Sequence, residues 1–433
     1  MNKVLLFGLL LATQLLLAQP KATTSGTAVK GLPVASAQKS ISAERSNRID
    51  RLLQEYVEKG WIAGATAIVI KDGAIVYHKG FGFSDLRTKE KIRTDHIFRI
   101  ASQTKAITSV GIMILFEEGK LLLDDPLSKY IPAFAKTQVL DQFNEKDSTY
   151  TTKPANKPIT IRHLLTHTSG IGYPQIGSKT YQAIAMKAGL SAMLGLPNRI
   201  LAEEVEKLAT LPLEHQPGEK FLYGLNSDVL GRVIEVVSQL SLADFLRTRI
   251  FEPLGMKDTW FYLPPDKQHR LVAIHGADSL GRAVPMEPTL TLNGIEIDGD
   301  YPKRAGKLYA GGAGLVSTAY DYALFMQMLL NNGILNGKRI LSPNSVRLMT
   351  TNQIGHVQSG FNRFGLGFGI IDAGESLRVG LSEGSYEWGG AFSSTYWIDP
   401  EKKIAAQLFL NMWPNPHPEI HDKFKVLVYS AME

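Results

Sequence analysis

The stretch FRIASQTKAITSVGIMILFEEG, residues 98–119, decides how the rest of this chain is interpreted. It places Ser102 and Lys105 three residues apart at the start of a segment that is otherwise mostly apolar. Residues at i and i+3 on a helix are neighbours, so the hydroxyl and the amine are expected within hydrogen-bond reach. An amine whose pKa is lowered by burial can take the proton of a serine hydroxyl, and a helix N-terminus suits a developing oxyanion. The segment is therefore consistent with acyl-transfer chemistry.

The Ser-x-x-Lys spacing is weak evidence by itself. A second copy, Ser36 to Lys39, lies in a polar segment with no apolar helix after it, and we interpret that copy as chance. On the spacing alone, a capping serine beside a solvated lysine is the better interpretation of the first copy. The rest of the chain has to decide between the two.

Bulk composition indicates an ordinary globular protein. The chain has 433 residues, of which 44% are hydrophobic and 20% charged, enough for one large or two medium domains. Its net charge of +6 is modest and no dense run of Lys and Arg occurs, which argues against nucleic acid as a partner. The chain has no cysteine, so disulfides and thiolate metal sites are excluded.

The N-terminus, MNKVLLFGLLLATQLLLAQP, resembles a targeting segment. The apolar run over residues 4–18 is shorter than the roughly 20 residues that a membrane span needs, and it has the length of a signal-peptide core. We predict a signal peptide over residues 1–18 and a flexible leader over residues 19–40. The domain is then exported, periplasmic or secreted, with no stable membrane span after cleavage. An uncleaved anchor is the alternative, and it leaves the domain outside the cytoplasm as well.

Strand patterns lie at both ends of the chain and helical patterns lie between them. Residues 65–70 and 74–78 flank the turn tripeptide Lys71-Asp72-Gly73, which predicts a hairpin. We expect an α/β (α+β) fold in which residues 41–110 and 301–433 form an antiparallel sheet flanked by helices, with a mostly helical domain, 111–300, inserted. Further strands are expected at residues 365–371, 393–398 and 404–411, and helices at residues 41–58, 201–208, 227–240, 242–250, 319–330 and from 419.

Residues 98–105, FRIASQTK, resemble the nucleophile segment of the serine β-lactamase and penicillin-binding superfamily. The resemblance is closer to the class C β-lactamase-like group, which includes family VIII carboxylesterases and D-peptidases. It implies a β-lactamase/transpeptidase-like fold over roughly residues 45–430. Four further segments match this group in order and spacing, namely 159–170 (ITIRHLLTHTSG), 217–231 (PGEKFLYGLNSDVLG), 310–321 (AGGAGLVSTAYD) and 388–390 (WGG).

The resemblance implies a role for each matching residue. Ser102 would be the nucleophile, and Lys105 and Tyr223 would share the general-base and general-acid work. The backbone N–H groups of Ser102 and Ala391 would form the oxyanion hole. No metal and no organic cofactor is implied. Trp388, Gly389 and Gly390 would border the substrate, with the alternative that Trp388 only packs against the sheet.

Two departures from the group's pattern bear on the substrate. The tyrosine motif often has Asn where this chain has Leu225, and Asn226 stands one place too late to be assigned that role. The third motif usually begins with Lys or His, and here it begins with Trp388. A lysine there would offer a cation to a substrate carboxylate, whereas an indole offers an N–H and an apolar face. Both changes favour neutral esters or amides over anionic β-lactams.

We therefore predict a serine hydrolase that hydrolyses carboxylic esters through an acyl-enzyme on Ser102. A D-amino-acid-specific peptidase, a β-lactamase and an acyltransferase of the same superfamily stay open. So does a non-catalytic, penicillin-binding-like protein that recognises peptidoglycan. The expected partner is a small-molecule ester, amide or β-lactam.

Two other patterns are discounted. Ser382 lies in a G-x-S-x-G sequence, but a nucleophile elbow needs a helix after the serine, and residues 385–390 lead toward a strand. His163 and His167 have the i, i+4 spacing of metal ligands. The glutamate of H-E-x-x-H is absent, so we expect a packed helix that ends at Gly170, with both histidines hydrogen-bonded.

Overall fold

The computed structural model describes residues 31–34, 41–190, 193–292, 295–357 and 363–432. The predicted signal peptide and most of the predicted leader lie outside the described residues. The described part of the leader contacts the fold, because the Ile75 backbone N–H donates to the Pro33 carbonyl at 2.8 Å. No helix in these described ranges is long and apolar enough to cross a membrane.

One antiparallel sheet of eight strands dominates the structure, in the order β14-β15-β16-β17-β18-β1-β2-β3. Its strands come from the two ends of the chain, as the strand patterns predict. The central pair, β1 with β18, joins these two ends. The strands are β1 (Gly64–Lys71), β2 (Ala74–Asp85), β3 (Glu90–Lys91), β14 (Arg363–Phe364), β15 (Gly369–Ile370), β16 (Tyr386–Gly390), β17 (Ser394–Asp399) and β18 (Ile404–Phe409).

The predicted N-terminal hairpin is present. Asp72 and Gly73 connect β1 to β2 with φ angles of 51° and 79°, the positive values that a tight two-residue hairpin turn favours. Residues 64–70 of β1 are all buried. Helices cover both faces of the sheet, so side chains on both sides of this strand are buried. This explains why its sequence is a continuous apolar run instead of an alternating one.

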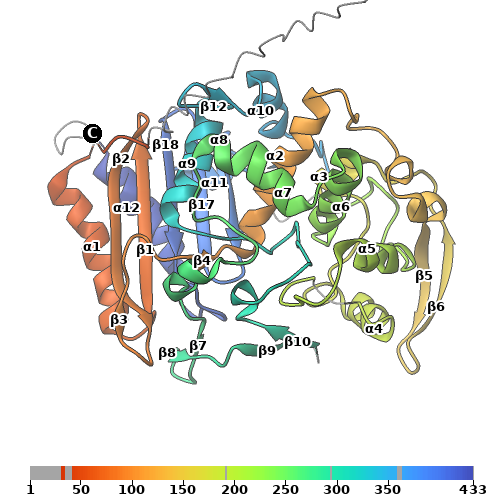
Figure 1. Cartoon of the computed structure of the whole chain (residues 1–433), viewed down its shortest axis with the longest axis horizontal. Coiled ribbons are helices and arrows are strands. Elements are labelled where there is room, and N and C mark those ends of the chain that lie inside the picture. The colour runs from red at the N-terminus through yellow and green to blue at the C-terminus, as the bar shows by residue number, and fades with distance from the viewer. Residues whose placement is uncertain (1–30, 35–40, 191–192, 293–294, 358–362, 433) are drawn as a thin grey trace, which may run out of the picture.

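Two helical layers cover the sheet (Figure 1). On one face α1 (Ala43–Glu58) and α12 (Glu419–Ala431) pack against each other and against the strands, in a cluster that includes Leu53, Val69 and Phe424. On the other face lie α2 (Thr104–Glu117) and α9 (Ala319–Leu330), in the main core. These faces alternate along β1, where Ile68 belongs to the main core.

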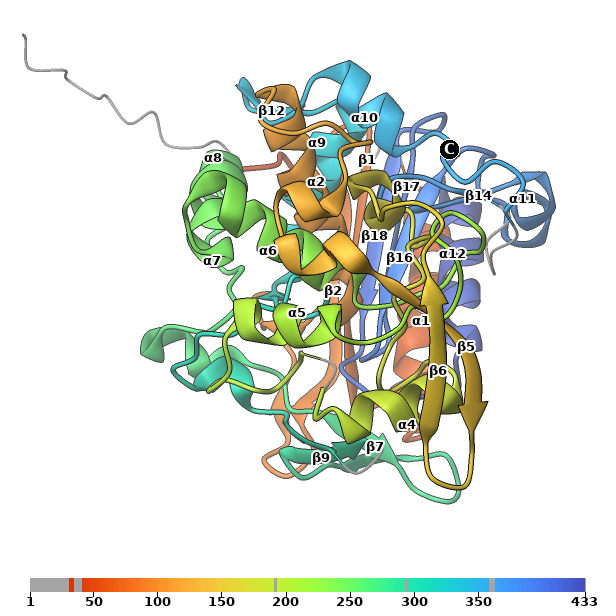
Figure 2. The same cartoon turned by 90° about the vertical axis from the view of Figure 1, so that its right-hand side faces the viewer.

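Helices α3, α4, α5 and α6 gather at the end of the molecule away from α1 and α12 (Figure 1), whereas α11 packs against α12. The hairpin β5–β6 stands at the outer edge of this region, beside α4 (Figure 2). Two further two-stranded pairs occur as β9–β10 and as β7–β8, and β7–β8 lies near the end of α1, where the Ala283 N–H donates to the Gly60 carbonyl at 2.6 Å. The predicted fold, an antiparallel sheet with flanking helices and an inserted helical part, is confirmed. The helices are α3 (Ile161–Leu165), α4 (Lys179–Lys187), α5 (Leu201–Ala209), α6 (Asn226–Ser238), α7 (Leu242–Leu246), α8 (Glu252–Leu254), α10 (Pro343–Met349) and α11 (Ala373–Val379), and the other strands are β4 (Phe98–Arg99), β5 (Gln138–Asn144), β6 (Thr149–Pro154), β7 (His275–Ala277), β8 (Ala283–Pro285), β9 (Thr289–Leu292), β10 (Ile295–Asp298), β11 (Val316–Ser317), β12 (Ile334–Leu335) and β13 (Lys338–Arg339).

Three local expectations differ from the structure. The strand expected over residues 365–371 is two short strands, because the chain turns back on itself where the Gly365 N–H donates to the Phe368 carbonyl. The helix expected over residues 242–250 changes after Leu246 into a π-helical turn, Arg247–Phe251. Trp388 and the two glycines after it precede the expected strand, β17, but they also form the end of a strand of their own, β16.

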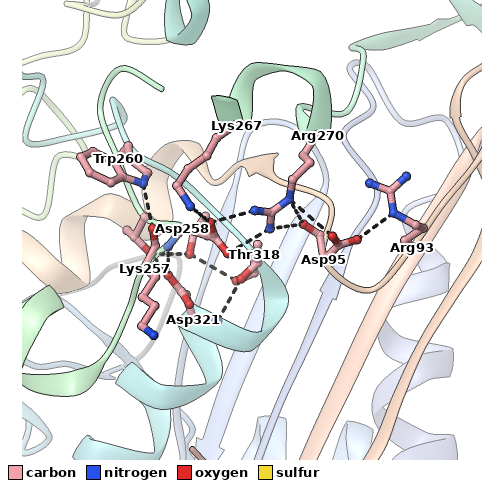
Figure 3. Close-up of polar contacts among 11 residues, drawn as sticks. Arg93, Asp95, Lys257, Asp258, Trp260, Lys267, Arg270, Thr318 and Asp321 are labelled. Atoms are coloured by element: carbon pink, nitrogen blue, oxygen red, sulfur yellow. Dashed lines mark hydrogen bonds and ion pairs between the residues drawn. The ribbon is translucent and has the colours of Figure 1, made fainter. Parts of the chain in front are cut away.

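A polar network fixes the start of α9 (Figure 3). The Thr318 hydroxyl caps the helix by accepting from the Asp321 N–H at 3.1 Å. The Asp321 carboxylate accepts from the Asp258 N–H at 2.6 Å and from the Thr259 hydroxyl at 3.0 Å. Asp258 in turn pairs with Lys267 and Arg270, which lie on the 3-10 helix Pro265–Arg270 (Figure 3). Asp321 is thus a structural residue.

We predict that Asp321→Asn changes the pH dependence of stability. Burial raises the pKa of Asp321 to about 7, whereas an unfolded aspartate titrates at about 4. The folded state then binds the proton more tightly, so the wild type loses stability as pH rises from about 4 to about 7. The amide has no such titration. The melting temperature of the variant relative to wild type should therefore be higher at pH 8 than at pH 5; a difference independent of pH would contradict this.

Candidate active site

Ser102 lies on a single 3-10 turn, Ala101–Gln103, that leads directly into α2. Ala101 has a φ of 44°, in the left-handed region that residues other than glycine rarely adopt. Strained backbone of this kind persists only where the surrounding structure determines it, and it concentrates at functional sites. The strain therefore marks the residue just before Ser102.

Lys105 is enclosed and its amine is aimed at Ser102. The residue is 2% exposed. Its Nζ donates to Ser102 Oγ at 3.3 Å and to the Gly312 carbonyl oxygen at 2.8 Å. The same Nζ lies 4.7 Å from the centroid of the Tyr223 ring. These contacts exclude the alternative of a solvated lysine beside a capping serine.

Tyr223 completes the group from a different part of the chain. It lies in the loop just before α6, and its hydroxyl donates to Ser102 Oγ at 2.7 Å. Ser102 Oγ therefore has a phenol and an amine as direct neighbours, although 121 residues separate the serine from the tyrosine. The structure brings together the three residues that the family resemblance selects.

The end of β16 lies against the Ser102 turn. A Cβ added to Gly390 would lie 2.4 Å from the Ile100 carbonyl oxygen, so only glycine allows this approach. Phe392 packs with Ala101 in a small apolar cluster. Ala391 lies between these two contacts, in the turn that follows β16. This placement is compatible with the backbone role that the resemblance implies for Ala391.

Aromatic side chains form one wall beside Ser102. The Tyr223 ring centroid lies 5.8 Å from that of Tyr173 and 5.5 Å from that of Trp388. The Trp388 ring also meets Phe364 edge-on at 5.4 Å, and Phe364 contacts Phe221 at 5.1 Å. Trp388 thus packs against the ring of Tyr223, the residue whose hydroxyl contacts the candidate nucleophile.

His163 and His167 do not form a metal site. Helix α3 ends at Leu165, and His167 follows in a left-handed conformation with a φ of 53°, so the two rings do not share a helix face. The predicted helix end at Gly170 is therefore wrong. His163 accepts the Thr160 N–H at 3.1 Å in a capping box. Among the described residues, no group of three or more His, Cys, Asp or Glu could hold a metal ion.

His167 instead braces the segment that carries Tyr223. Burial, with a smaller contribution from the charge of Lys105, keeps the pKa of His167 well below its usual value, so the ring is neutral. Its Nδ1 lies 2.9 Å from Asn226 Nδ2 and 3.4 Å from the Gly224 nitrogen. The Asn226 amide oxygen also accepts from Ser169 at 2.5 Å. Asn226 is thus engaged by His167 and Ser169.

Ser382 lies far from this group. Its backbone N–H donates to Asp399 Oδ2 at 3.1 Å, at the C-terminal end of β17. Gly390 pairs with Ser394 at the opposite end of that strand. Five residue steps of about 3.3 Å each separate these two ends by about 16 Å. The G-x-S-x-G sequence therefore does not contribute to the Ser102 site.

Sequence reasoning assigned no role to the loop that supports Lys105. The Thr108 hydroxyl donates to the Gly311 carbonyl at 2.7 Å, one helical turn beyond Lys105. The Gly312 N–H donates to Asp228 Oδ1 at 3.0 Å. The loop and Asp228 both lie in segments that match the family motifs, so the sequence did single them out. Nothing in the sequence showed that Asp228 and Gly312 are in contact.

This combination of a sheet flanked by helices with a serine, a lysine and a tyrosine in direct contact defines a class of active-site serine enzymes. The family model described as beta-lactamase matches residues 49–430, and the chain belongs to this family. It is a serine hydrolase of the beta-lactamase family.

Relatives with esterase names cover most of the chain. It is 30% identical to the lovastatin esterase of Penicillium rubens, over 82% of this chain and 90% of the relative. It is 27% identical to esterase EstB of Burkholderia gladioli, over 86% of this chain and 91% of the relative. Among solved structures, EstCE1, a hydrolase with promiscuous acyltransferase activity, superposes with a TM-score of 0.77 at 25% identity, covering 89% of this chain and 98% of EstCE1.

The geometry predicts which serine reacts with an acylating probe. A fluorophosphonate should label wild-type protein and Ser382→Ala, and it should leave Ser102→Ala unlabelled. The Ser102 hydroxyl contacts an amine and a phenol that can take its proton, whereas the Ser382 hydroxyl has no hydrogen-bond partner among the described residues. The label is counted by intact mass and located by peptide mapping. Ser382→Ala is the matched control, since it removes the other motif serine. Labelling of Ser102→Ala would refute the assignment.

Proposed function

We propose that this enzyme hydrolyses carboxylic esters through an acyl-enzyme on Ser102. One observation carries the proposal: the Ser102 hydroxyl is contacted directly by both a phenol and a buried amine, at 2.7 and 3.3 Å. Such contacts provide a route for the serine proton, which a hydroxyl needs in order to act as a nucleophile. The esterase relatives support the choice of substrate class.

In acylation, Ser102 Oγ attacks the ester carbonyl while its proton passes to the Lys105–Tyr223 pair. The C–O bond to the alcohol then breaks, and the pair returns the proton to the departing alkoxide. Tyr223 is the group placed to do this, because its hydroxyl lies directly on Ser102 Oγ. The oxyanion that forms in between would be held by the N–H groups of Ser102 and Ala391.

Deacylation repeats these steps with water in place of the alcohol. The pair takes a proton from water as the hydroxyl attacks the acyl carbonyl, and it gives a proton to Ser102 Oγ as the acyl–enzyme bond breaks. The carboxylic acid leaves and the serine is restored. Protein groups supply both proton transfers.

The aromatic wall supports neutral substrates. Trp388 and Tyr173 both lie beside Tyr223, so an acyl or alcohol group bound next to Ser102 meets ring faces. Apolar contact with such rings stabilises uncharged groups, whereas a substrate carboxylate would lose hydration without gaining a cation from Trp388. This favours esters over anionic β-lactams and D-alanyl peptides.

Acyl transfer is the second candidate. The solved relative EstCE1 is described as a hydrolase with promiscuous acyltransferase activity. An apolar wall beside the acyl-enzyme would favour an alcohol over water as the acceptor. The same Ser102 chemistry serves both reactions, because only the second nucleophile differs.

We also propose that the protein acts outside the cytoplasm, on the basis of its apolar N-terminal segment.

Steady-state kinetics with p-nitrophenyl butyrate and nitrocefin test the proposal. We expect kcat/KM for the ester to exceed that for nitrocefin by at least about tenfold, a difference of about 1.4 kcal/mol in transition-state stabilisation. Tyr223→Phe should lower kcat for the ester by about 100-fold or more, since it removes one proton-transfer group. Product analysis with added 1-butanol separates transfer from hydrolysis. Nitrocefin, or a D-alanyl peptide, as the better substrate would overturn the esterase proposal.

Trp388→Lys should shift the preference toward anionic substrates. The ammonium would lie where the family pattern usually has a cation, and it could pair with a substrate carboxylate. We expect the ratio of kcat/KM for nitrocefin to that for p-nitrophenyl butyrate to rise about tenfold. Trp388→Phe, which keeps the apolar face, is the matched control and should leave the ratio unchanged. An unchanged ratio in the lysine variant would show that Trp388 does not face the substrate.

A further inference from the structure

The loop that follows Gly311 is tied to one face of α2. The Gly311 carbonyl accepts from Thr108 at 2.7 Å, and the Gly312 carbonyl accepts from Lys105 at 2.8 Å. Leu315, further along the loop, donates its N–H to the Thr104 hydroxyl at 3.2 Å. Because three residues in the first two turns of α2 contact this one loop, the position of the loop and the position of the Lys105 amine are coupled.

Asp228 holds the same loop from the opposite side. It lies in the first turn of α6, five residues after Tyr223, and is 1% exposed. Its Oδ1 accepts from the Gly312 N–H at 3.0 Å. A Cβ added to Gly312 would lie only 2.4 Å from Asp228 Oδ2, so the carboxylate packs directly on this peptide. A single residue, Gly312, therefore connects the carboxylate to the Lys105 amine, through its N–H on one side and its carbonyl on the other.

Asp228 also lies within electrostatic range of the proposed proton-transfer groups. Burial raises the pKa of Asp228 to about 6, against the opposing effect of the Lys105 charge. Tyr173, which stacks on Tyr223, feels the charge of Asp228 as well. Three other described titratable groups lie near the Lys105 amine: the rings of Tyr173 and Tyr223, at 5.7 and 4.7 Å, and His167, which is neutral. Above about pH 6, Asp228 is therefore ionised, and its negative charge acts on Lys105 and Tyr173.

Resting on the acylation of Ser102 proposed above, we propose that Asp228 is a positioning residue with two effects. Through the N–H and the carbonyl of Gly312 it fixes where the Lys105 amine lies relative to Ser102. Its negative charge also stabilises the protonated form of the Lys105–Tyr223 pair, which makes the pair a stronger base when it takes the proton of the serine hydroxyl. If Asp228 only stabilised the first turn of α6, neither effect on Lys105 would be expected.

Asp228→Asn separates charge from geometry, because the amide oxygen can still accept from the Gly312 N–H. We expect KM for p-nitrophenyl butyrate to stay within about twofold and kcat to fall severalfold. The ascending limb of kcat/KM against pH should move to lower pH by about one unit, since loss of a nearby negative charge weakens the base. Asp228→Leu removes the acceptor too, so kcat should fall about 100-fold through misplacement of the amine.

Asp321→Asn is the matched control, because it neutralises another buried carboxylate that lies outside the site. In this variant the ascending limb of kcat/KM against pH should lie at the same pH as in wild type. If Asp228→Asn does not fold, Gly312→Ala replaces it: the added methyl pushes the carboxylate away, and the same limb should move to lower pH. In every variant, active sites are counted by fluorophosphonate labelling.

The outcomes distinguish this inference from the proposed function. An unlabelled Ser102 in wild type would defeat the ester hydrolysis proposal, and the positioning role with it. Normal wild-type labelling and hydrolysis, together with an unmoved pH limb in Asp228→Asn or in its replacement, would defeat the positioning role alone. A loss of kcat that only follows the fraction of labelled sites would likewise show that Asp228 is merely structural.

Discussion

The burial of one amine is the constraint on which the rest of this structure depends. An ammonium taken out of water is costly unless hydrogen bonds and charges replace its hydration. Lys105 finds a carbonyl on the Gly312 loop, the Ser102 hydroxyl and the face of the Tyr223 ring. Three segments from different parts of the chain must therefore meet at this point, and each contact that satisfies the amine also directs it at the serine.

The layered fold makes that meeting possible. The sheet joins strands from both ends of the chain through the β1–β18 pair, which brings β16 beside the start of α2. The close approach of Gly390 to the Ile100 carbonyl then sets the end of β16 against the Ser102 turn. The helical part supplies Tyr223 from the other side. The site is thus built between the sheet and the helical part, where α2 contacts both.

Charged groups and aromatic rings lie on different sides of Ser102. Lys105 and Asp228 lie on the buried side, connected by the carbonyl and the N–H of Gly312. Trp388, Tyr173 and Phe364 surround Tyr223 or its neighbours with ring faces. On the opposite face of β16, the neighbouring Glu387 pairs with Lys425 at 2.5 Å, so its charge points away from the aromatic wall. The alternation of a strand places these two environments on opposite sides of the sheet.

The sequence by itself determined the strands at both ends, the major helices and the three residues at the site. Apolar periodicity and turn residues are local signals, so the β1–β2 hairpin and helices such as α9 could be predicted from them. The mostly exposed hairpin β5–β6 carries little apolar pattern and was missed. The family motifs selected Ser102, Lys105 and Tyr223 without showing that they touch. Only the tertiary structure decided that Asp228 and Gly312 support Lys105, because those contacts span up to 207 residues and no local pattern encodes them.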